Sequence, residues 1–354
     1  MRPLLTVAIP TYNGGDNLLR AVRSCRNINL PRNEVEILVV DNCSTDNSIN
    51  ELEKVKKKFS NLRIVRNEKN IGRIGNWNKC LDLAEGKYLI FLFSNDEINR
   101  SMDFRYFINI LENDHEINMI YNRAVFIYGD KIFLSDIFFD KGKKVKTYKF
   151  IEEVFYKNLN FTSFGILQQH IYRKSIIDEY NIRFLESIDR TTDRMFICDV
   201  CMAKDGYIFF GNEIQCKWYL TSNRYHYRTH VDINSIDLID SFNKNWGQEY
   251  LANKYILEKI NVKEEDIVKA HYSKFYNSYI ISKLKKVLGK SLTPDELLLP
   301  AFIKLLEVKL NYQSKSLFFK TKKVVPKVIK TISMFDYIII GAGFAGSVIA
   351  ERIA

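Results

Sequence analysis

Short apolar runs alternate with amphipathic stretches over the first hundred residues of the chain. The apolar runs predict four buried strands, at residues 4–9, 35–40, 62–65 and 88–93. Between them apolar residues recur at helical spacing, and Asp16 and Asp46 are placed to cap two helices. A third helix is expected over residues 76–85, where Gly86 would end it. Strands that alternate with helices in this way predict a parallel sheet covered on both faces.

Polar residues gather directly after three of the predicted strands. They are Thr11, Tyr12 and Asn13, then Asp41, Asn42 and Ser44, and finally Ser94, Asn95 and Asp96. In sheets of this kind, ligands bind at the carboxyl ends of the strands, near the point where the strand order reverses. One acid after one strand is typical of a helix cap, whereas polar groups after three strands indicate a shared ligand.

Four stretches of the chain resemble, in order, the motifs of a known family. They are residues 7–13 (VAIPTYN), 38–46 (LVVDNCSTD), 67–78 and 91–97. With these motifs the chain resembles the family 2 glycosyltransferases over about its first hundred residues, and more loosely over the next 130. The resemblance implies the GT-A fold, a Rossmann-like α/β sheet, and inverting transfer of a sugar from a nucleotide-diphosphate donor. Residues 70–78 are similar to those of bacterial O-antigen transferases such as the abequosyltransferases.

The motifs also imply a donor site, and its residue types suit a nucleotide sugar. The implied donor residues are Pro10, Thr11, Tyr12, Asn13, Asp41, Arg73, Asn95 and Asp96. Tyr12 offers an aromatic face to the base, and Asp41 can accept a hydrogen bond from the imide N–H of uracil. The planar fork of Arg73 matches diphosphate oxygens or can buttress the base. A UDP-sugar is therefore the expected donor.

A divalent metal, Mn or Mg, is implied by the family's acidic turn after the fourth strand, but this turn departs from the family pattern. Asn95 stands where the family has a ribose-facing carboxylate, and Asp96 occupies the metal position. The resemblance implies His230 as a second ligand and Arg228 as a diphosphate contact, although a lone histidine is more often structural. The thinned turn predicts a lower metal affinity or a different donor.

An inverting transferase also needs one carboxylate to take the proton from the acceptor hydroxyl as it attacks. The family presents an acidic pair at the start of a helix in this region. Here Asp193 is the nearest equivalent and the predicted base, with Asp189 as the alternative. A plain helix-capping role remains open for Asp193.

The pattern divides the chain into four segments. Residues 1–235 form the expected GT-A domain, with a nucleotide-sugar half at 1–100 and an acceptor half at 101–235. A helical extension is expected at 236–311, a basic amphipathic tail at 312–333, and a βα fragment at 334–354. Within the acceptor half, residues 101–113 predict a helix and residues 118–128 a strand.

The last segment carries a glycine motif that points to another class of protein. Residues 341–346 read GAGFAG after an apolar strand, and the segment resembles the start of UDP-galactopyranose mutase. The chain stops before the second strand of such a βαβ unit, so we expect no FAD and no working site. The association favours UDP-galactofuranose as one candidate donor and the mutase as a pathway neighbour. A flavin oxidoreductase and a non-catalytic sugar-binding relative are the alternatives.

The distribution of basic residues along the chain indicates where a membrane contact is expected. The chain carries +11, from 53 basic and 42 acidic residues, and residues 304–330 hold eight lysines against one glutamate. Lysines interleaved with apolar residues favour an anionic membrane surface over a solvated tail, and nucleic acid is not expected because no binding module accompanies them. No apolar run reaches the length of a bilayer span. We therefore expect a cytoplasmic enzyme, peripheral on the inner face of the cell membrane, that acts on a lipid-linked saccharide in O-antigen or capsule synthesis.

Overall fold

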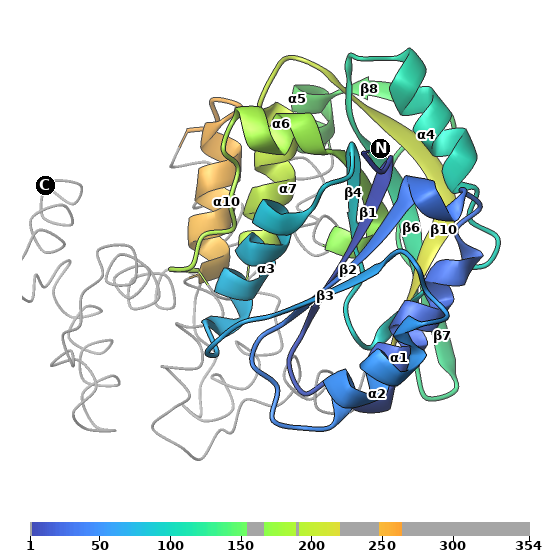
Figure 1. Cartoon of the computed structure of the whole chain (residues 1–354). Coiled ribbons are helices and arrows are strands. Elements are labelled where there is room, and N and C mark those ends of the chain that lie inside the picture. The colour runs from blue at the N-terminus through green and yellow to red at the C-terminus, as the bar shows by residue number, and fades with distance from the viewer. Residues whose placement is uncertain (1, 154–165, 189–190, 220–247, 264–354) are drawn as a thin grey trace, which may run out of the picture. The chain divides into compact units, whose positions relative to one another are not determined.

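A mixed sheet forms the centre of the computed structural model, which describes residues 2–153, 166–188, 191–219 and 248–263 (Figure 1). Within these residues the sheet has ten strands in the order β3-β2-β1-β4-β9-β6-β10-β5, with β7 paired to β6 and β8 to β10. The strands are β1 (Leu5–Thr11), β2 (Val35–Asp41), β3 (Leu62–Arg66), β4 (Tyr88–Phe91), β5 (Asp96–Ile98), β6 (Ile117–Tyr128), β7 (Lys131–Leu134), β8 (Lys144–Lys146), β9 (His170–Arg173) and β10 (Tyr207–Tyr219).

Helices connect and cover these strands. The α-helices are α1 (Gly15–Ser24), α2 (Ser48–Lys56), α3 (Gly72–Leu83), α4 (Phe104–Asn113), α5 (Thr147–Phe150), α6 (Lys174–Glu179), α7 (Thr192–Met202) and α10 (Gln248–Glu258). Short 3₁₀ turns are η1 (Cys25–Asn27), η2 (Arg32–Glu34) and η4 (Leu167–Gln169). Among the described residues, none of the helices combines the length and apolar composition needed to cross a membrane.

The predicted parallel sheet is confirmed for the first four strands. β1 pairs in parallel with both β2 and β4, and β2 pairs in parallel with β3. The chain therefore builds the sheet outward from β1 to β3 and then returns to place β4 on the other side of β1. Ligands bind at such a reversal of strand order. Beyond β4 the sheet becomes mixed, because β9 runs antiparallel to β4 and β6.

Alternate residues of the central strands face two different helix layers. Leu5, Val7 and Ile9 of β1 lie in one apolar cluster with residues of α1, α2 and α4. On the opposite face, the ring of Phe91 in β4 packs edge-on against Phe184 and against Phe196 of α7. Figure 1 shows α1 and α2 on one side of the sheet and α3 and α7 on the other. The result is the α/β GT-A architecture that the motifs implied.

Several predicted helix boundaries were wrong. Helix α3 begins at Gly72, four residues before the predicted start, and ends before Ala84. Gly86 instead permits a close approach of strands, since a Cβ there would lie 2.5 Å from the backbone nitrogen of Thr6. Asp16 lies inside the first turn of α1, where Gly14 takes the capping position. The predicted helix at 101–113 and strand at 118–128 are confirmed as α4 and β6.

The described part of the chain falls in two compact units. The elements from β1 to β10, together with Tyr255–Val262, belong to the first, and residues 248–254 belong to the second. Asp189, Arg228 and His230 lie outside the described residues, as do the segments at 312–333 and 334–354 and most of 236–311. The segment boundaries predicted from sequence stay predictions.

Candidate active site

A pocket of about 520 Å³ opens at the carboxyl ends of β1 and β4. Its walls combine aromatic rings, side-chain amides, one cation and one carboxylate. The lining residues are Pro10, Thr11, Tyr12, Asn42, Asn70, Arg73, Asn76, Trp77, Phe93, Ser94, Asn95, Ile166, Leu167, Gln168, Asp193 and Trp218. A cavity of this size with convergent polar groups is typical of a small-ligand site.

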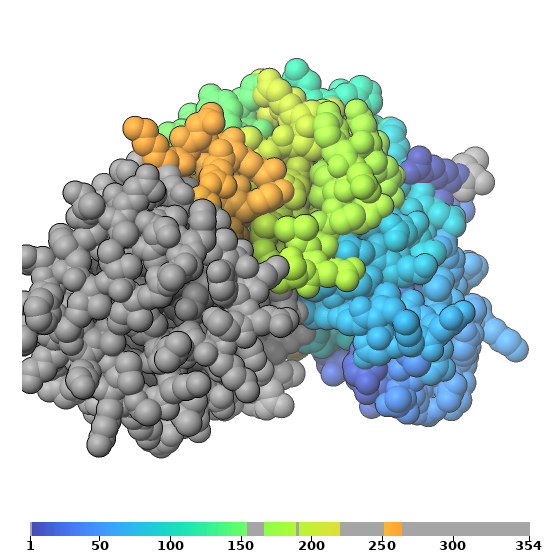
Figure 2. Space-filling model, turned by 90° about the vertical axis from the view of Figure 1, so that its left-hand side faces the viewer, coloured from blue at the N-terminus to red at the C-terminus, as the bar shows by residue number. Residues whose placement is uncertain are grey.

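Helices α3 and α7 form one side of this pocket and are tied together through Phe184. The side chain of Asn78 accepts from the backbone N–H of Phe184 (2.8 Å) and donates to its carbonyl (3.0 Å). The Phe184 ring stacks on Phe196 of α7 at 4.1 Å and packs against Trp77 of α3 at 5.2 Å. Figure 2 shows the light-blue surface of the segment that contains α3 next to the yellow-green surface of the segment that contains α6 and α7. Arg73 on α3 and Asp193 on α7 are thereby held in one wall.

Asp193 lies in the first turn of α7, at the pocket surface. Burial raises the pKa of its carboxyl above the usual value for aspartate, and the positive charges of Arg194 and Arg73 offset only part of this effect. One carboxylate oxygen accepts from the backbone N–H of Arg194 at 2.9 Å. A carboxylate with a raised pKa is a stronger base, which suits proton abstraction near neutral pH.

The donor end of the pocket contains the aromatic and cationic groups that the motifs implied. Tyr12 is half exposed, so its ring is accessible to a planar ligand. The guanidinium of Arg73 lies 4.8 Å from the centroid of the Trp77 ring, a cation–π arrangement that fixes its direction. These groups can hold a base and an anionic diphosphate.

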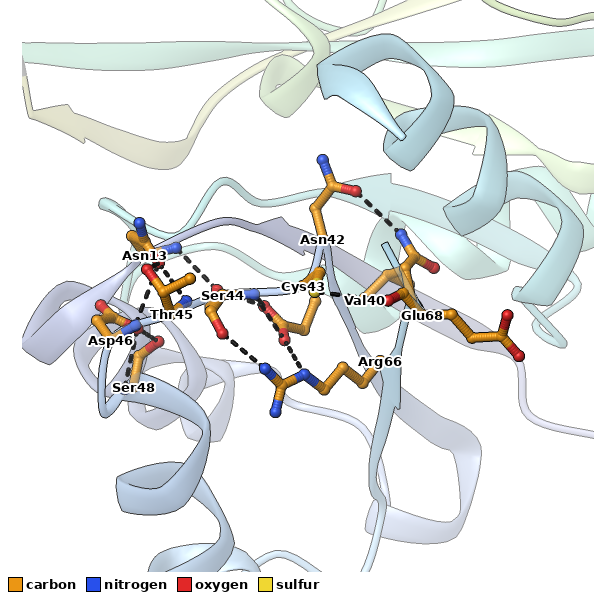
Figure 3. Close-up of polar contacts among 12 residues, drawn as sticks. Asn13, Val40, Asn42, Cys43, Ser44, Thr45, Asp46, Ser48, Arg66 and Glu68 are labelled. Atoms are coloured by element: carbon orange, nitrogen blue, oxygen red, sulfur yellow. Dashed lines mark hydrogen bonds and ion pairs between the residues drawn. The ribbon is translucent and has the colours of Figure 1, made fainter. Parts of the chain in front are cut away.

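Asn13 and Asp41 hold the loops of the site rather than lining the pocket. Asn13 has φ +51°, donates its backbone N–H to Ser44, and accepts from the backbone N–H of Thr45 at 2.8 Å. The buried carboxylate of Asp41 accepts from the N–H and hydroxyl of Ser44 and pairs with Arg66 at 3.3 Å. Figure 3 shows this network joining the loop after β1 to the loop after β2. A contact between Asp41 and a base stays a prediction.

Asn42 determines where α3 begins. Its side-chain oxygen accepts from the backbone N–H of Ile71 (2.9 Å), and its amide donates to the Gly72 carbonyl (3.1 Å) and to Asn70 (2.8 Å). The amide of Asn42 thus anchors the loop that leads into α3, whose first turn carries Arg73. Sequence reasoning placed Asn42 in the strand-end cluster but did not assign it this role.

The turn after β4 is built from Ser94, Asn95 and Asp96. Asn95 lines the pocket and donates to the backbone oxygen of Tyr219 at 3.3 Å. Asp96 is fully buried behind the wall, where one of its carboxylate oxygens accepts from the Gln168 side chain at 2.7 Å.

These residues do not fit a metal ion by themselves. Transferases with this fold commonly use a divalent metal. Within the described residues, however, no group of three or more His, Cys, Asp or Glu side chains could hold one. Asp96 is directed to Gln168, and His230 lies outside those residues.

The structure therefore brings together six of the residues predicted from sequence. These are Pro10, Thr11, Tyr12, Arg73, Asn95 and Asp193. Sequence reasoning missed the aromatic and amide residues that complete the pocket, of which Trp77, Gln168 and Trp218 come from three separate elements. Two polar wall atoms, Thr11 Oγ1 and Trp218 Nε1, are buried and make no hydrogen bond in the described part of the protein.

Comparison with known proteins identifies the domain that carries this pocket. Residues 6–180 match the family model described as glycosyl transferase family 2. This part of the chain is similar to that family. The family 2 domain supplies the loops after β1, β2 and β4, and Asp193 and Trp218 come from the residues that follow it.

Several similar proteins are named as glycosyltransferases of poly(ribitol-phosphate). The chain is 28% identical over 197 residues to the poly(ribitol-phosphate) beta-N-acetylglucosaminyltransferase TarS of Staphylococcus aureus. This alignment covers 54% of this chain and 31% of TarS. Over 251 residues it is 24% identical to TarP of the same species, covering 70% and 69% of the two chains. Over 116 residues it is 31% identical to the poly(ribitol-phosphate) beta-glucosyltransferase of Bacillus spizizenii, covering 32% and 18%. The matched part of the chain thus spans 31% of the length of TarS and 18% of the length of the Bacillus spizizenii enzyme.

Solved structures show the same fold. The crystal structure of S. aureus TarS 1-349 in complex with UDP-GlcNAc aligns with a TM-score of 0.59 at 18% identity, covering 86% of this chain and 81% of the other. The complex of the same protein with UDP aligns with a TM-score of 0.58 at 17% identity. At this identity the likeness shows the GT-A fold alone.

Proposed function

We propose that this protein is an inverting glycosyltransferase that moves a sugar from a UDP-sugar to a hydroxyl of a bacterial surface polymer. One observation carries the proposal. Asp193, a carboxylate with a raised pKa that follows the residues matched by the family 2 model, lines the same pocket as Arg73 and the aromatic residue Tyr12. The TarS complexes with UDP and UDP-GlcNAc support a uridine donor.

In the proposed reaction the acceptor oxygen attacks the anomeric carbon as the bond from that carbon to the diphosphate oxygen breaks. Asp193 takes the proton of the acceptor hydroxyl, so the acceptor becomes a glycoside and UDP leaves with its added negative charge. Arg73 offsets charge on the diphosphate, and Tyr12 covers the base. Attack opposite the leaving group inverts the anomeric centre.

The acceptor and the transferred sugar are the finer parts of the proposal. The names of TarS and TarP favour a poly(ribitol-phosphate) acceptor. A lipid-linked saccharide of O-antigen or capsule at the inner membrane face, with UDP-galactofuranose as one donor, is the candidate from the motifs. A panel of UDP-, GDP- and CDP-sugars, scored by the rise in Tm of unfolding, would select the donor, because a ligand that binds the folded state stabilises it.

Replacement of Asp193 by Asn tests the mechanism directly. We expect Asp193→Asn to lower kcat at least 100-fold, because the amide cannot accept the proton, while the Kd for UDP stays within about twofold. Isothermal titration with UDP, with and without Mn, supplies the Kd. No UDP binding in either condition would overturn the uridine assignment, and full residual turnover would overturn the role of Asp193.

A further inference from the structure

Trp218 is a pocket residue to which none of the motifs assigns a role. It lies near the end of β10, opposite Asp96 of β5 in antiparallel register and beside Phe126 of β6 in parallel register. Its side chain lines the pocket together with Asp193 and Gln168. The ring therefore belongs to the wall formed by the second half of the domain.

The indole N–H of Trp218 is buried and makes no hydrogen bond within the described residues. Indole N–H groups in buried positions normally find an acceptor, because a desolvated donor without one is unfavourable. Trp218 lines the pocket, so a ligand bound there is the candidate source of that acceptor.

The ring is held in place without a ligand. Its centroid lies 5.1 Å from that of Phe126, and strands pair with β10 on both sides of Trp218. The neighbouring Tyr219 is fixed by Arg20, whose guanidinium lies 4.5 Å from the tyrosine ring. A donor held in this way loses little freedom on binding, which favours a defined contact.

The chemistry around Trp218 indicates which part of a ligand it meets. Tyr12 stands in the loop after β1 and Arg73 in the first turn of α3, and they suit a base and a diphosphate. The lining that contains Trp218 also includes the neutral amide of Gln168 and the carboxylate of Asp193, the proposed base. A neutral N–H beside an aromatic face suits a sugar ring, which offers both hydroxyl oxygens and apolar C–H groups.

We propose that Trp218 binds a saccharide ring, donating its indole N–H to a sugar hydroxyl and packing its ring against the sugar C–H face. This inference rests on the proposed function and deepens it. The ring belongs to the sugar of the donor or to a sugar unit of the acceptor, whereas an acyclic ribitol unit would offer the same hydroxyl oxygens and C–H groups without a ring.

The variant Trp218→Phe separates these sources, because it keeps an aromatic ring against Phe126 and removes the N–H. Titrations use UDP and UDP-GlcNAc, and initial rates are measured against poly(ribitol-phosphate). If the ring meets the donor sugar, the Kd for UDP-GlcNAc rises about 3- to 10-fold while that for UDP is unchanged. If it meets the acceptor, both Kd values hold and the KM for the polymer rises by a similar factor.

Tyr207→Phe is the matched control, since Tyr207 begins the same strand but does not line the pocket. Trp218→Tyr is the second variant if Trp218→Phe unfolds at a lower Tm than the control. Unchanged values for UDP-GlcNAc and polymer in a folded variant would overturn the role of Trp218, as would an equal loss of UDP and UDP-GlcNAc binding. Absence of UDP binding by the unsubstituted protein would instead count against the proposed function.

Discussion

Asp193 shows how the surroundings of one side chain prepare it for chemistry. Burial raises its carboxyl pKa, while Arg194 and Arg73 oppose that shift. Both effects set the pH at which the carboxyl gains or loses its proton. The pH dependence of kcat/KM can therefore report on the pKa of Asp193 without replacing that residue.

Replacement of Arg194 by Gln should shift the acid limb of kcat/KM to higher pH. The proposed base must be deprotonated, so activity falls as the pH drops through its pKa. Removal of the Arg194 charge raises that pKa further. We expect the acid limb of kcat/KM, measured between pH 4.5 and 8 at constant ionic strength, to lie at higher pH in the variant. An acid limb at the same pH in both proteins would contradict the assignment of Asp193.

His170 makes a second prediction, for stability rather than activity. It is fully buried in β9, stacks on Tyr172, and directs Nδ1 to the carbonyl of Ile166 at 3.0 Å. Burial lowers its pKa to about 3. The unfolded chain takes up a proton near pH 6.5 while the folded protein does not, so stability falls as the pH drops from about 6.5 toward 3.

The corresponding variant is His170→Asn, which removes the titrating group. The contribution of His170 to the slope approaches about 1.4 kcal/mol per pH unit below pH 6. Urea unfolding between pH 7 and 4.5 measures the free energy in both proteins. Because the carboxylates contribute equally to the two proteins, the variant should show the shallower dependence. Equal slopes would show that His170 does not stay neutral in the fold.

At the scale of elements, the loops after β1 and β2 act as one structure. Asn13 accepts from the N–H of Thr45 and Asp46, and Asp46 accepts from the N–H of Gly15 at the start of α1. The loop that presents Tyr12 therefore depends on both the side-chain oxygen and the backbone conformation of Asn13.

Asn13→Gly and Asn13→Ala separate two contributions to this clamp. Both remove the side-chain acceptor, at a cost of about 1 kcal/mol in unfolding free energy, and both should weaken UDP binding. Alanine must also adopt φ near +51°, which glycine does readily, so Asn13→Ala should be less stable by about a further 1 kcal/mol. Urea unfolding and UDP titration measure both effects. Equal stability of the two variants would refute the backbone argument.

The buried strands were easier to predict from sequence than the start of helix α3. β1 and β2 are buried along their whole length, so their apolar runs marked them to within about two residues. The start of α3 was not predicted because it depends on hydrogen bonds to Asn42 in the loop after β2. The sequence around α3 does not reveal such a long-range contact.

The pocket wall at Trp218 was missed for a related reason. β10 shifts register against β6 between Phe210 and Ile214 and again before Cys216. Each shift changes which side chains face the pocket, and irregularities of this kind carry weak sequence signals. Tyr12 and Asp193 were found because motifs carry them, whereas Gln168 and Trp218 reach the site only through tertiary pairing.

At the scale of the whole molecule, the charge of the chain separates catalysis from attachment. Residues 304–330 hold eight lysines against one glutamate, whereas the pocket that we assign to catalysis lies within residues 10–218. If the basic segment binds an anionic membrane, donor binding and membrane binding should be separable by truncation.

Three versions of the chain test that separation: the full chain, residues 1–333 and residues 1–311. All three should bind UDP with the same Kd, within about twofold, because the lining residues are retained in each. Only the first two should sediment with vesicles of phosphatidylglycerol and phosphatidylcholine, and added salt should release them, since about 1 kcal/mol per lysine comes from screened attraction. Equal sedimentation of 1–311 would place the membrane contact elsewhere, and loss of UDP binding in 1–333 would show that the glycine motif at 341–346 belongs to the donor site after all.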